Sequence, residues 1–251
     1  MPYHYFTSIS CDCKIYINYM KQKSVDVDMA AAAKADVKFI HLYSHGGSVD
    51  FSLLEGYPNP GFAPKIFTVD GHIDERISCF LSDNLLQMTI SENRKIQDLS
   101  FLEKAPHLQI LNLYNLSRIT TLPLSKLPQL SVLHISGLHK LTDMESLAQS
   151  NVQYLNIKLS ADKVSATRIA DVLLRMPSLK VLNIGPFNLV QCKKTPIIRR
   201  QFEKAGRSDV ITLFSLSTLL KEVEGTGAEL PRNLPSVAEV VQKWEIDENT
   251  K

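Results

Sequence analysis

Apolar residues recur along this chain with one short spacing. In four segments, an apolar side chain is followed by a second three residues later and by a third two residues after that. The four segments begin at Leu85, Leu108, Leu130 and Val152, and are therefore 23, 22 and 22 residues apart. This regularity predicts a stack of similar structural units, because one such unit cannot bury its own apolar face alone.

The same spacing continues in both directions with longer gaps between copies. Looser copies begin at Val37 and Pro64 upstream, and at Leu179 and Val210 downstream. We therefore expect about eight strands over residues 37–216, with regular units at 85–157. The first, fourth and sixth positions of each unit should form three apolar columns inside the stack.

The L-x-x-L-x-L spacing resembles that of the leucine-rich-repeat family. The resemblance implies an α/β solenoid, with a curved parallel sheet on its concave face and helices and 3-10 turns on its convex face. Many members of the family place asparagine or cysteine at the ninth position of the repeat. Here the ninth positions hold Asn93, Leu116, Leu138, Ser160 and Phe187, so we expect no asparagine ladder and turns packed by apolar side chains.

The segments that return from one strand to the next carry helix signals. After Ser160, four apolar residues lie at helical spacing and Pro177 ends the pattern, which predicts a helix. Thr195 and Pro196 should begin another helix that ends at Gly206, with Ile198, Phe202 and Ala205 on its packed face. A short helix is expected over 74–81, with Ile77, Phe80 and Leu81 pointing inward, and 3-10 turns over 120–128.

Both ends of an open solenoid expose its core, so we expect caps. Residues 1–36 should form an N-terminal cap from a strand at 15–19 and a helix at 24–35. Residues 217–246 should form a C-terminal helical cap, because Val237, Val240, Val241 and Trp244 share one helix face. Residues 247–251 are expected to be a disordered tail.

The third, fifth and seventh positions of each unit alternate with the core positions, so they should share the concave face. Those positions combine aromatic and uncharged hydrogen-bonding residues, as the centres of protein interfaces do. Sheet propensity explains the β-branched and aromatic residues but not the asparagines, which are poor strand formers. We expect a partner protein to bind there through seven residues: Tyr43, Asn112, Tyr114, His134, Tyr154, Asn156 and Lys158.

Composition limits the other functions. The net charge of +2 is too small for nucleic-acid binding through a general positive field. The first residues do not follow a secretory signal pattern, and no window holds the roughly 18 consecutive apolar residues of a membrane span. Four scattered cysteines fit reduced thiols better than a disulfide framework. We expect a cytoplasmic monomer that is not an enzyme, with no cofactor, no metal site and no stable membrane insertion.

Two alternatives stay open at this stage. One is an enzyme that uses Cys192 or a histidine as its reactive group. The other is a membrane-surface binder that uses the basic segment 193–207, whose cationic residues are Lys193, Lys194, Arg199, Arg200, Lys204 and Arg207. The irregular short repeats are also similar to those of leucine-rich-repeat effectors of the Legionella group. That similarity would imply translocation into a host cell without a classical signal peptide, and inhibition or redirection of a host target.

Overall fold

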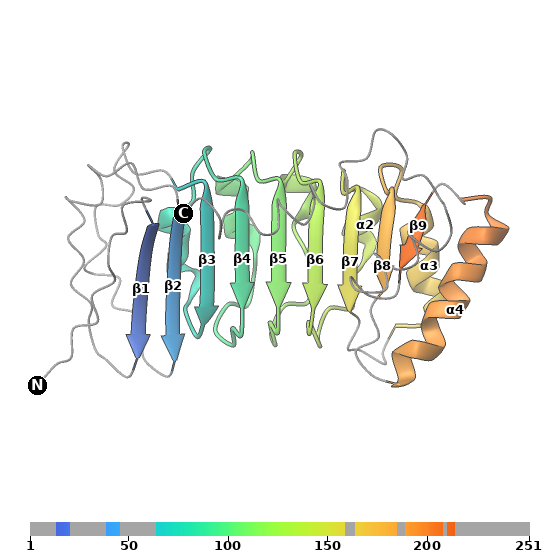
Figure 1. Cartoon of the computed structure of the whole chain (residues 1–251), viewed down its shortest axis with the longest axis horizontal. Helices are drawn as coiled ribbons and strands as arrows, with labels where there is room; N and C mark the ends of the chain where they lie inside the picture. Colours follow the sequence, from blue (N-terminus) through green and yellow to red (C-terminus); the bar gives the residue numbers. More distant parts are fainter. Residues whose placement is uncertain are drawn as a thin grey trace, which may run out of the picture.

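The chain builds one parallel sheet whose strands follow each other in sequence order. The structure, a computed structural model, describes residues 14–20, 39–45, 64–158, 164–184, 189–207 and 210–213. Each strand of the sheet pairs only with its sequence neighbours within these ranges (Figure 1). The strands are β1 (Lys14–Met20), β2 (Phe39–His45), β3 (Ile66–Gly71), β4 (Gln87–Ser91), β5 (Ile110–Tyr114), β6 (Val132–Ser136), β7 (Tyr154–Lys158), β8 (Val181–Ile184) and β9 (Ile211–Leu213).

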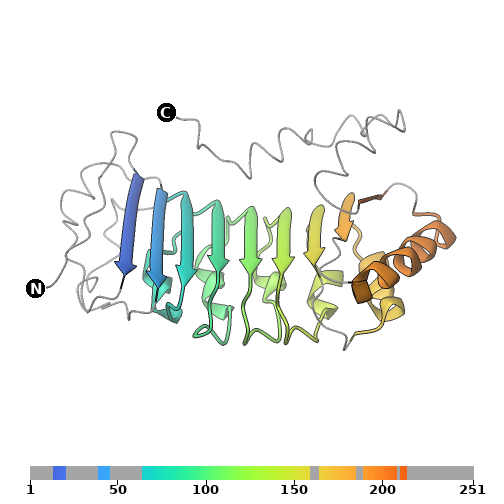
Figure 2. The ribbon, with the colours of Figure 1, turned by 60° about the horizontal axis from the view of Figure 1, so that its bottom comes forward.

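The return segments from η2 to α3 lie together on one side of the sheet (Figure 2). They are η2 (Glu75–Phe80), η3 (Ser100–Lys104), η4 (Leu124–Lys126), α2 (Glu145–Ala148) and α3 (Ala166–Leu174), and α4 (Leu189–Lys204) follows β8 at the end of the stack. Repeat length decides the type of return. The units of 22 or 23 residues leave room only for single turns, as predicted for 120–128. The longer gaps after Val152 and Leu179 hold α3 and α4.

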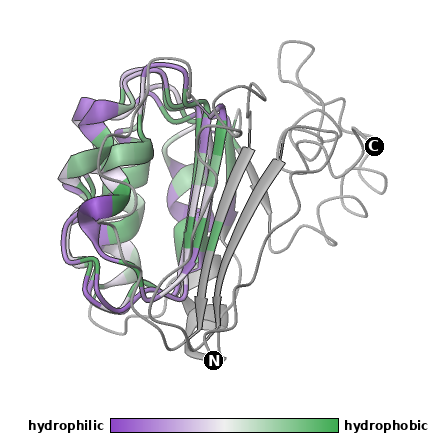
Figure 3. Cartoon of the chain, turned by 90° about the vertical axis from the view of Figure 1, so that its left-hand side faces the viewer, coloured by the Kyte–Doolittle hydropathy of each residue, from purple (hydrophilic) through white to green (hydrophobic). Residues whose placement is uncertain are grey.

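The three predicted apolar columns form the core. Their described members, from Leu85 to Leu182, are at most 2% exposed. Seen along the stack, hydrophobic stretches of ribbon occur both in the sheet and in the return segments opposite it (Figure 3), and the buried side chains of the two layers form one core cluster. Ile77, Phe80 and Leu81 are also buried, as expected from the sequence, although their segment forms a 3-10 helix capped by Asp74.

A residue in the left-handed backbone region follows each of β4, β5 and β6. The φ angles are 51° at Glu92, 52° at Asn115 and 72° at Gly137. The backbone N–H of Glu92 donates to the carbonyl oxygen of Tyr114, and that of Asn115 donates to the carbonyl oxygen of Ser136. Each turn therefore extends the hydrogen bonding between neighbouring strands by one bond. A Cβ atom at Gly137 would collide with the side chain of Asn115, whose amide donates to the Glu92 carboxylate.

Replacing Gly137 by alanine is therefore expected to lower the free energy of unfolding by about 2–3 kcal/mol, through the left-handed backbone and the displacement of Asn115. Gly206 is the matched control, because its φ is 68° but an added Cβ would meet no atom within 4 Å. Gly206→Ala should lose only about 1 kcal/mol. Urea denaturation of the two variants measures the difference, and equal losses would show that the Asn115 contact contributes nothing.

Two predicted helix starts are wrong. The helix placed after Ser160 begins after Ser165, whose hydroxyl oxygen accepts from the backbone N–H of Arg168 at 3.2 Å. The helix placed at Thr195 begins at Leu189, so Pro196 lies inside α4. Packing of α4 against α3 offsets the backbone hydrogen bond that a proline removes.

Two smaller expectations also fail near the C-terminal end. Ala205 is exposed, whereas Ile198 and Phe202 on the same predicted face are buried. In the last strand, Thr212 pairs with Leu182 rather than with Val181, so the unit is shifted by one residue from its predicted register. The strand expected at 15–19 is β1. The helix at 24–35, the cap at 217–246 and the tail at 247–251 lie outside the described residues.

Candidate protein-interaction surface

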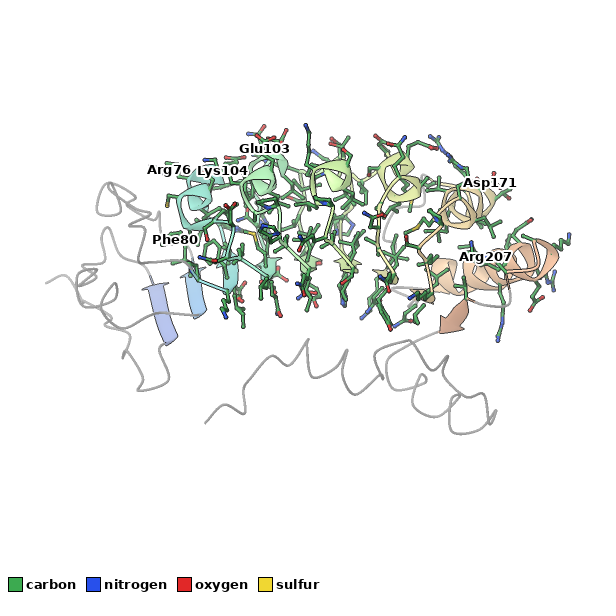
Figure 4. The ribbon with its side chains drawn as sticks, turned by 90° about the horizontal axis from the view of Figure 1, so that it is seen from above. Arg76, Phe80, Glu103, Lys104, Asp171 and Arg207 are labelled. Atoms are coloured by element: carbon green, nitrogen blue, oxygen red, sulfur yellow. The ribbon has the colours of Figure 1, made fainter. Side chains whose placement is uncertain are left out.

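The parallel register aligns the predicted binding positions in three rows across the sheet. We call the face turned away from the return segments the concave face (Figure 4). Its third row runs through Ile66, Gln87, Ile110, Val132, Tyr154 and Val181. Its central row runs through Thr68, Thr89, Asn112, His134, Asn156 and Asn183. Its seventh row runs through Asp70, Ser91, Tyr114, Ser136 and Lys158.

His134 connects the central row with the seventh row. Its Nδ1 lies 3.3 Å from the Tyr114 hydroxyl and 3.2 Å from the Asn156 amide nitrogen. The amide nitrogen can only donate, so Nδ1 accepts and the ring proton sits on Nε2. The rings of Tyr114 and His134 also pack with centroids 4.6 Å apart at a 51° tilt. On the N-terminal side of this cluster, the Asn112 amide on β5 donates to the Thr89 hydroxyl on β4 at 3.1 Å.

The chemistry of this cluster is that of a neutral surface. Burial, followed by the charge of Lys158, lowers the pKa of His134 to about 4. Burial raises the pKa of the Tyr114 hydroxyl. Both groups are therefore uncharged at neutral pH and present hydrogen-bonding atoms and ring surface rather than ionic charge.

Six of the seven predicted binding residues lie on three adjacent strands. Asn112, Tyr114, His134, Tyr154, Asn156 and Lys158 belong to β5, β6 and β7. Tyr43 is not part of this patch, because it lies on β2, between Asn18 and Asp70 in the register, and its side chain is outside the described residues. Asn183, which shares the fifth position in sequence, continues the central row onto β8 and belongs with the patch.

The predicted residues differ in how far they reach solvent. Asn112, His134, Tyr154 and Asn156 are only 6–8% exposed, whereas Tyr114 and Lys158 in the seventh row are half-buried. Three amide oxygens on this face are buried and accept no hydrogen bond from any residue within the described ranges: those of Gln87, Asn156 and Asn183. Buried acceptors of this kind normally have a donor, so the face is ready to accept N–H or O–H groups.

Two arginines of the basic segment, Arg199 and Arg207, contact other groups of the chain. The Arg207 guanidinium donates to the carbonyl oxygens of Leu174 and Leu179, which ties the end of α4 to the neighbouring unit. Arg199 lies 3.9 Å from the Glu203 carboxylate. The side chains of Cys192, Lys193 and Lys194 are outside the described part of the structure.

The described residues give little support to the alternative of an enzyme with a reactive cysteine. Burial raises the pKa of the Cys79 thiol to about 11, which leaves little thiolate to act as a nucleophile at neutral pH. Within the described ranges, no three side chains of histidine, cysteine, aspartate or glutamate are grouped as a metal site would need. No helix in the same ranges is long and apolar enough to cross a bilayer.

The structure resembles a solved repeat protein. It is similar to a crystal structure of an internalin from Listeria monocytogenes, with a TM-score of 0.51 and 17% sequence identity over 80% of this chain and 54% of that one. The fold is a leucine-rich-repeat solenoid. The chain spans about half the length of that internalin, and the likeness concerns the fold alone. No protein-family model and no curated protein matches the sequence.

Within this leucine-rich-repeat solenoid, Asn93 alone among the described ninth positions is an asparagine. Its side chain is fully buried, and its amide donates to the carbonyl oxygens of Gly71 and Ile73 at 2.8 and 2.6 Å. Its Oδ1 accepts from the backbone N–H groups of Lys95 and Ile96, both at 2.9 Å. Leu116 and Leu138 are buried at the same position of the following units, so apolar packing replaces the asparagine there, as predicted.

Proposed function

We propose that this solenoid binds another protein through its concave face and does not catalyse a reaction. The proposal rests on the cluster of Tyr114, His134 and Asn156, which come from three adjacent strands and hold one another by hydrogen bonds and ring packing. Side chains fixed before binding lose little conformational entropy when a partner arrives. Aromatic residues are also the side chains that contribute most at protein interfaces.

The size of the face favours a protein over a small molecule. Strands β3 to β8 at about 4.8 Å spacing give a width of about 24 Å. Within the described ranges no group of metal-ligating side chains interrupts the rows, which offer ring surface and amide groups around Tyr114, His134 and Asn156. Tyr114 and Lys158 in the half-buried seventh row are the residues that a partner can reach first.

Replacing Tyr114 by alanine is expected to weaken partner binding about 30-fold, which corresponds to about 2 kcal/mol for the loss of an interface tyrosine. Asn156→Asp should weaken it about tenfold, because it places a charge beside the neutral His134. Lys126→Ala is the control, since Lys126 is exposed on η4, on the convex side. Binding is measured by capture from host cells and then by titration of the captured protein.

Unchanged capture by both Tyr114→Ala and Asn156→Asp would exclude the concave face as the binding site. Thermal melting of each variant shows whether a loss of binding comes from a loss of folding. A loss with Lys126→Ala equal to that with Tyr114→Ala would instead place the partner on the convex side.

The setting that we propose is the cytoplasm of a host cell, where the solenoid acts as a translocated bacterial effector that inhibits or redirects its partner. The irregular, short repeats support this setting through their similarity to effectors of the Legionella group. A module of this size could cover the active site of a bound enzyme. Inhibition of the captured partner by the wild-type chain but not by Tyr114→Ala is the expected result.

A further inference from the structure

Three exposed cations form a row along the edge of the sheet where the strands end. The turns after β4, β5 and β6 lie side by side at this edge (Figure 1). The last paired residues of these strands, Ser91, Tyr114 and Ser136, are aligned by the register. A cation follows four residues after each of them, and these cations, which we call the cationic row, are Lys95, Arg118 and Lys140. All three are exposed.

The core holds the backbone of the cationic row in place. The residue directly after each cation is buried, and these residues are Ile96, Ile119 and Leu141. The turns are also joined, because the backbone N–H of Ser117 donates to the carbonyl oxygen of Asn93 at 3.4 Å. The backbone positions of the row therefore follow the strands at a spacing of about 4.8 Å, while the charged groups reach into solvent.

The chain supplies little negative charge to the cationic row. Within the described ranges, no ion pair involves a cation of the row, and the carboxylates pair instead with Arg76, Arg175 and Arg199. Asp98 and Asp143 follow three residues after the first and the third cation. Their carboxylates accept from backbone N–H groups of the return segments, at Ser100 and Glu145. These acidic residues therefore hold the turns of the fold rather than the cations.

The row is most positive toward the C-terminal end of the stack. At its other end, the hydrogen bond from Arg76 lowers the pKa of Asp74, and the charge of Lys95 lowers it further, so Lys95 already shares a carboxylate. Lys158, at the end of β7, adds a cation beyond Lys140. No aspartate or glutamate occurs in the two strand ends that carry the other cations, residues 114–118 and 136–140.

The opposite edge of the sheet, where the strands begin, carries no such row. The segments that lead into β4 to β7 contain no lysine or arginine in residues 83–86, 106–109, 128–131 and 150–153. The neutral side chains of Asn84, Gln129 and Asn151 are exposed there instead. In these units the cations are therefore concentrated at the edge next to Tyr114, which lies in the seventh row of the concave face.

We propose that the cationic row receives an acidic, amphipathic helix of the partner protein, which lies across the strands beside Tyr114. Like charges at neighbouring positions of a sheet repel each other, so the row does not stabilise the free solenoid. A stripe of carboxylates would neutralise it, and complementary charges of this kind steer a partner to its site. The proposal rests on the proposed function and adds the chemistry of the partner.

The spacing of the row favours a helix over an extended segment. Side chains at i and i+4 on a helix are about 5–6 Å apart, close to the strand spacing of about 4.8 Å. Side chains on one face of an extended strand repeat at about 6.6 Å. The distance from β4 to β7 is about 14 Å, which a helix of about ten residues spans. Tyr114 can then pack against the apolar side of that helix.

Fluorescence anisotropy with a designed peptide tests the proposal on the full chain. The probe is a labelled helix of about 15 residues, with glutamates at helical spacing on one side and leucines on the adjacent side. The control peptide has the same composition, but its glutamates are distributed around the helix. At low ionic strength, the striped peptide should bind about tenfold more tightly than the control peptide. Equal affinities would overturn the proposal.

Charge reversal locates the binding of the striped peptide. Arg118→Glu combined with Lys140→Glu should weaken it at least about tenfold. Lys104→Glu combined with Lys126→Glu makes the same change of charge on η3 and η4 and should weaken it less than about twofold. Equal losses in the two double variants would show attraction by net charge alone and overturn the proposal. If the first variant does not fold, Arg118→Gln with Lys140→Gln replaces it, with an expected loss of about fivefold.

Other polyanions are tested in the same way. A single-stranded oligonucleotide and vesicles that contain phosphatidylserine should bind the wild type and the variant with Arg118→Glu and Lys140→Glu about equally. If either one binds the wild type more tightly than the striped peptide does, and loses this binding in the variant, the row is a phosphate site and the proposal is wrong.

Capture of the partner separates this proposal from the proposed function. Arg118→Glu combined with Lys140→Glu should weaken capture, and more strongly at low than at high ionic strength. If Tyr114→Ala weakens capture and this double variant does not, only the proposal about the cationic row fails. If the striped peptide binds through the row but neither Tyr114→Ala nor Asn156→Asp weakens capture, only the proposed function fails.

Discussion

Replacing Asn93 by alanine is expected to lower the free energy of unfolding by about 3–4 kcal/mol. The side chain is fully buried and makes four hydrogen bonds to backbone groups of two consecutive turns. Alanine would leave two carbonyl oxygens and two N–H groups without their partner, and each buried polar group left unsatisfied costs about 1–3 kcal/mol before relaxation and water entry reduce the sum. Urea denaturation measures the change.

Two further variants make the Asn93 result specific. Asn93→Leu copies the residue found at this position in the next two units and fills the space, but it cannot replace the hydrogen bonds. It should still lose about 2 kcal/mol. Asn84→Ala is the control at an exposed asparagine of the preceding unit and should change stability by less than about 0.5 kcal/mol. If Asn93→Leu is as stable as the wild type, the turn depends on packing alone.

Acidification is expected to destabilise the solenoid through His134. The folded chain holds the pKa of His134 at about 4, whereas the usual value is 6.5. Between these two pH values the unfolded chain binds a proton that the folded chain does not, so stability falls as the pH falls. The loss begins near pH 6.5 and is complete near pH 4, where it reaches about 3 kcal/mol.

His134→Gln isolates this contribution, because glutamine keeps a hydrogen-bonding side chain and does not titrate. The variant is expected to lose less stability than the wild type between pH 7 and pH 4, by about 3 kcal/mol. Asn84→Gln, at an exposed position outside the sheet, carries no titrating group and should follow the wild-type profile. Identical pH profiles for wild type and His134→Gln would show that His134 is not held neutral by the fold.

The sequence spacing predicted the register of the central strands because each strand contributes the same inward positions to the core. The pairings from β2 to β8 follow directly from the copies that begin at Val37 to Leu179. The prediction failed at β9, where 31 residues separate the copies. Val210 and Ile211 are both apolar, so the sequence offers two frames one residue apart, and only the pairing of Thr212 with Leu182 decides between them.

The candidate site was predicted as rows, and the structure adds the contacts between rows. Tyr114 belongs to the seventh row and His134 to the central row of the next strand, yet their rings pack together. This diagonal contact depends on side-chain rotamers and on the stagger of the strands, which the repeat pattern does not contain. The repeat pattern also did not predict that Tyr154 and Asn156 would be only 8% and 6% exposed.

The central claim is that a protein partner sits on the concave face, and site-specific photo-crosslinking tests it most directly. A photoreactive amino acid replaces Lys158 at the end of β7 in one variant and Lys104 in η3 on the convex side in another. In host cells, position 158 is expected to give a discrete adduct with the partner that Tyr114→Ala strongly reduces, while position 104 gives none. An adduct from position 104 alone, or the same adduct from both positions, would contradict the claim.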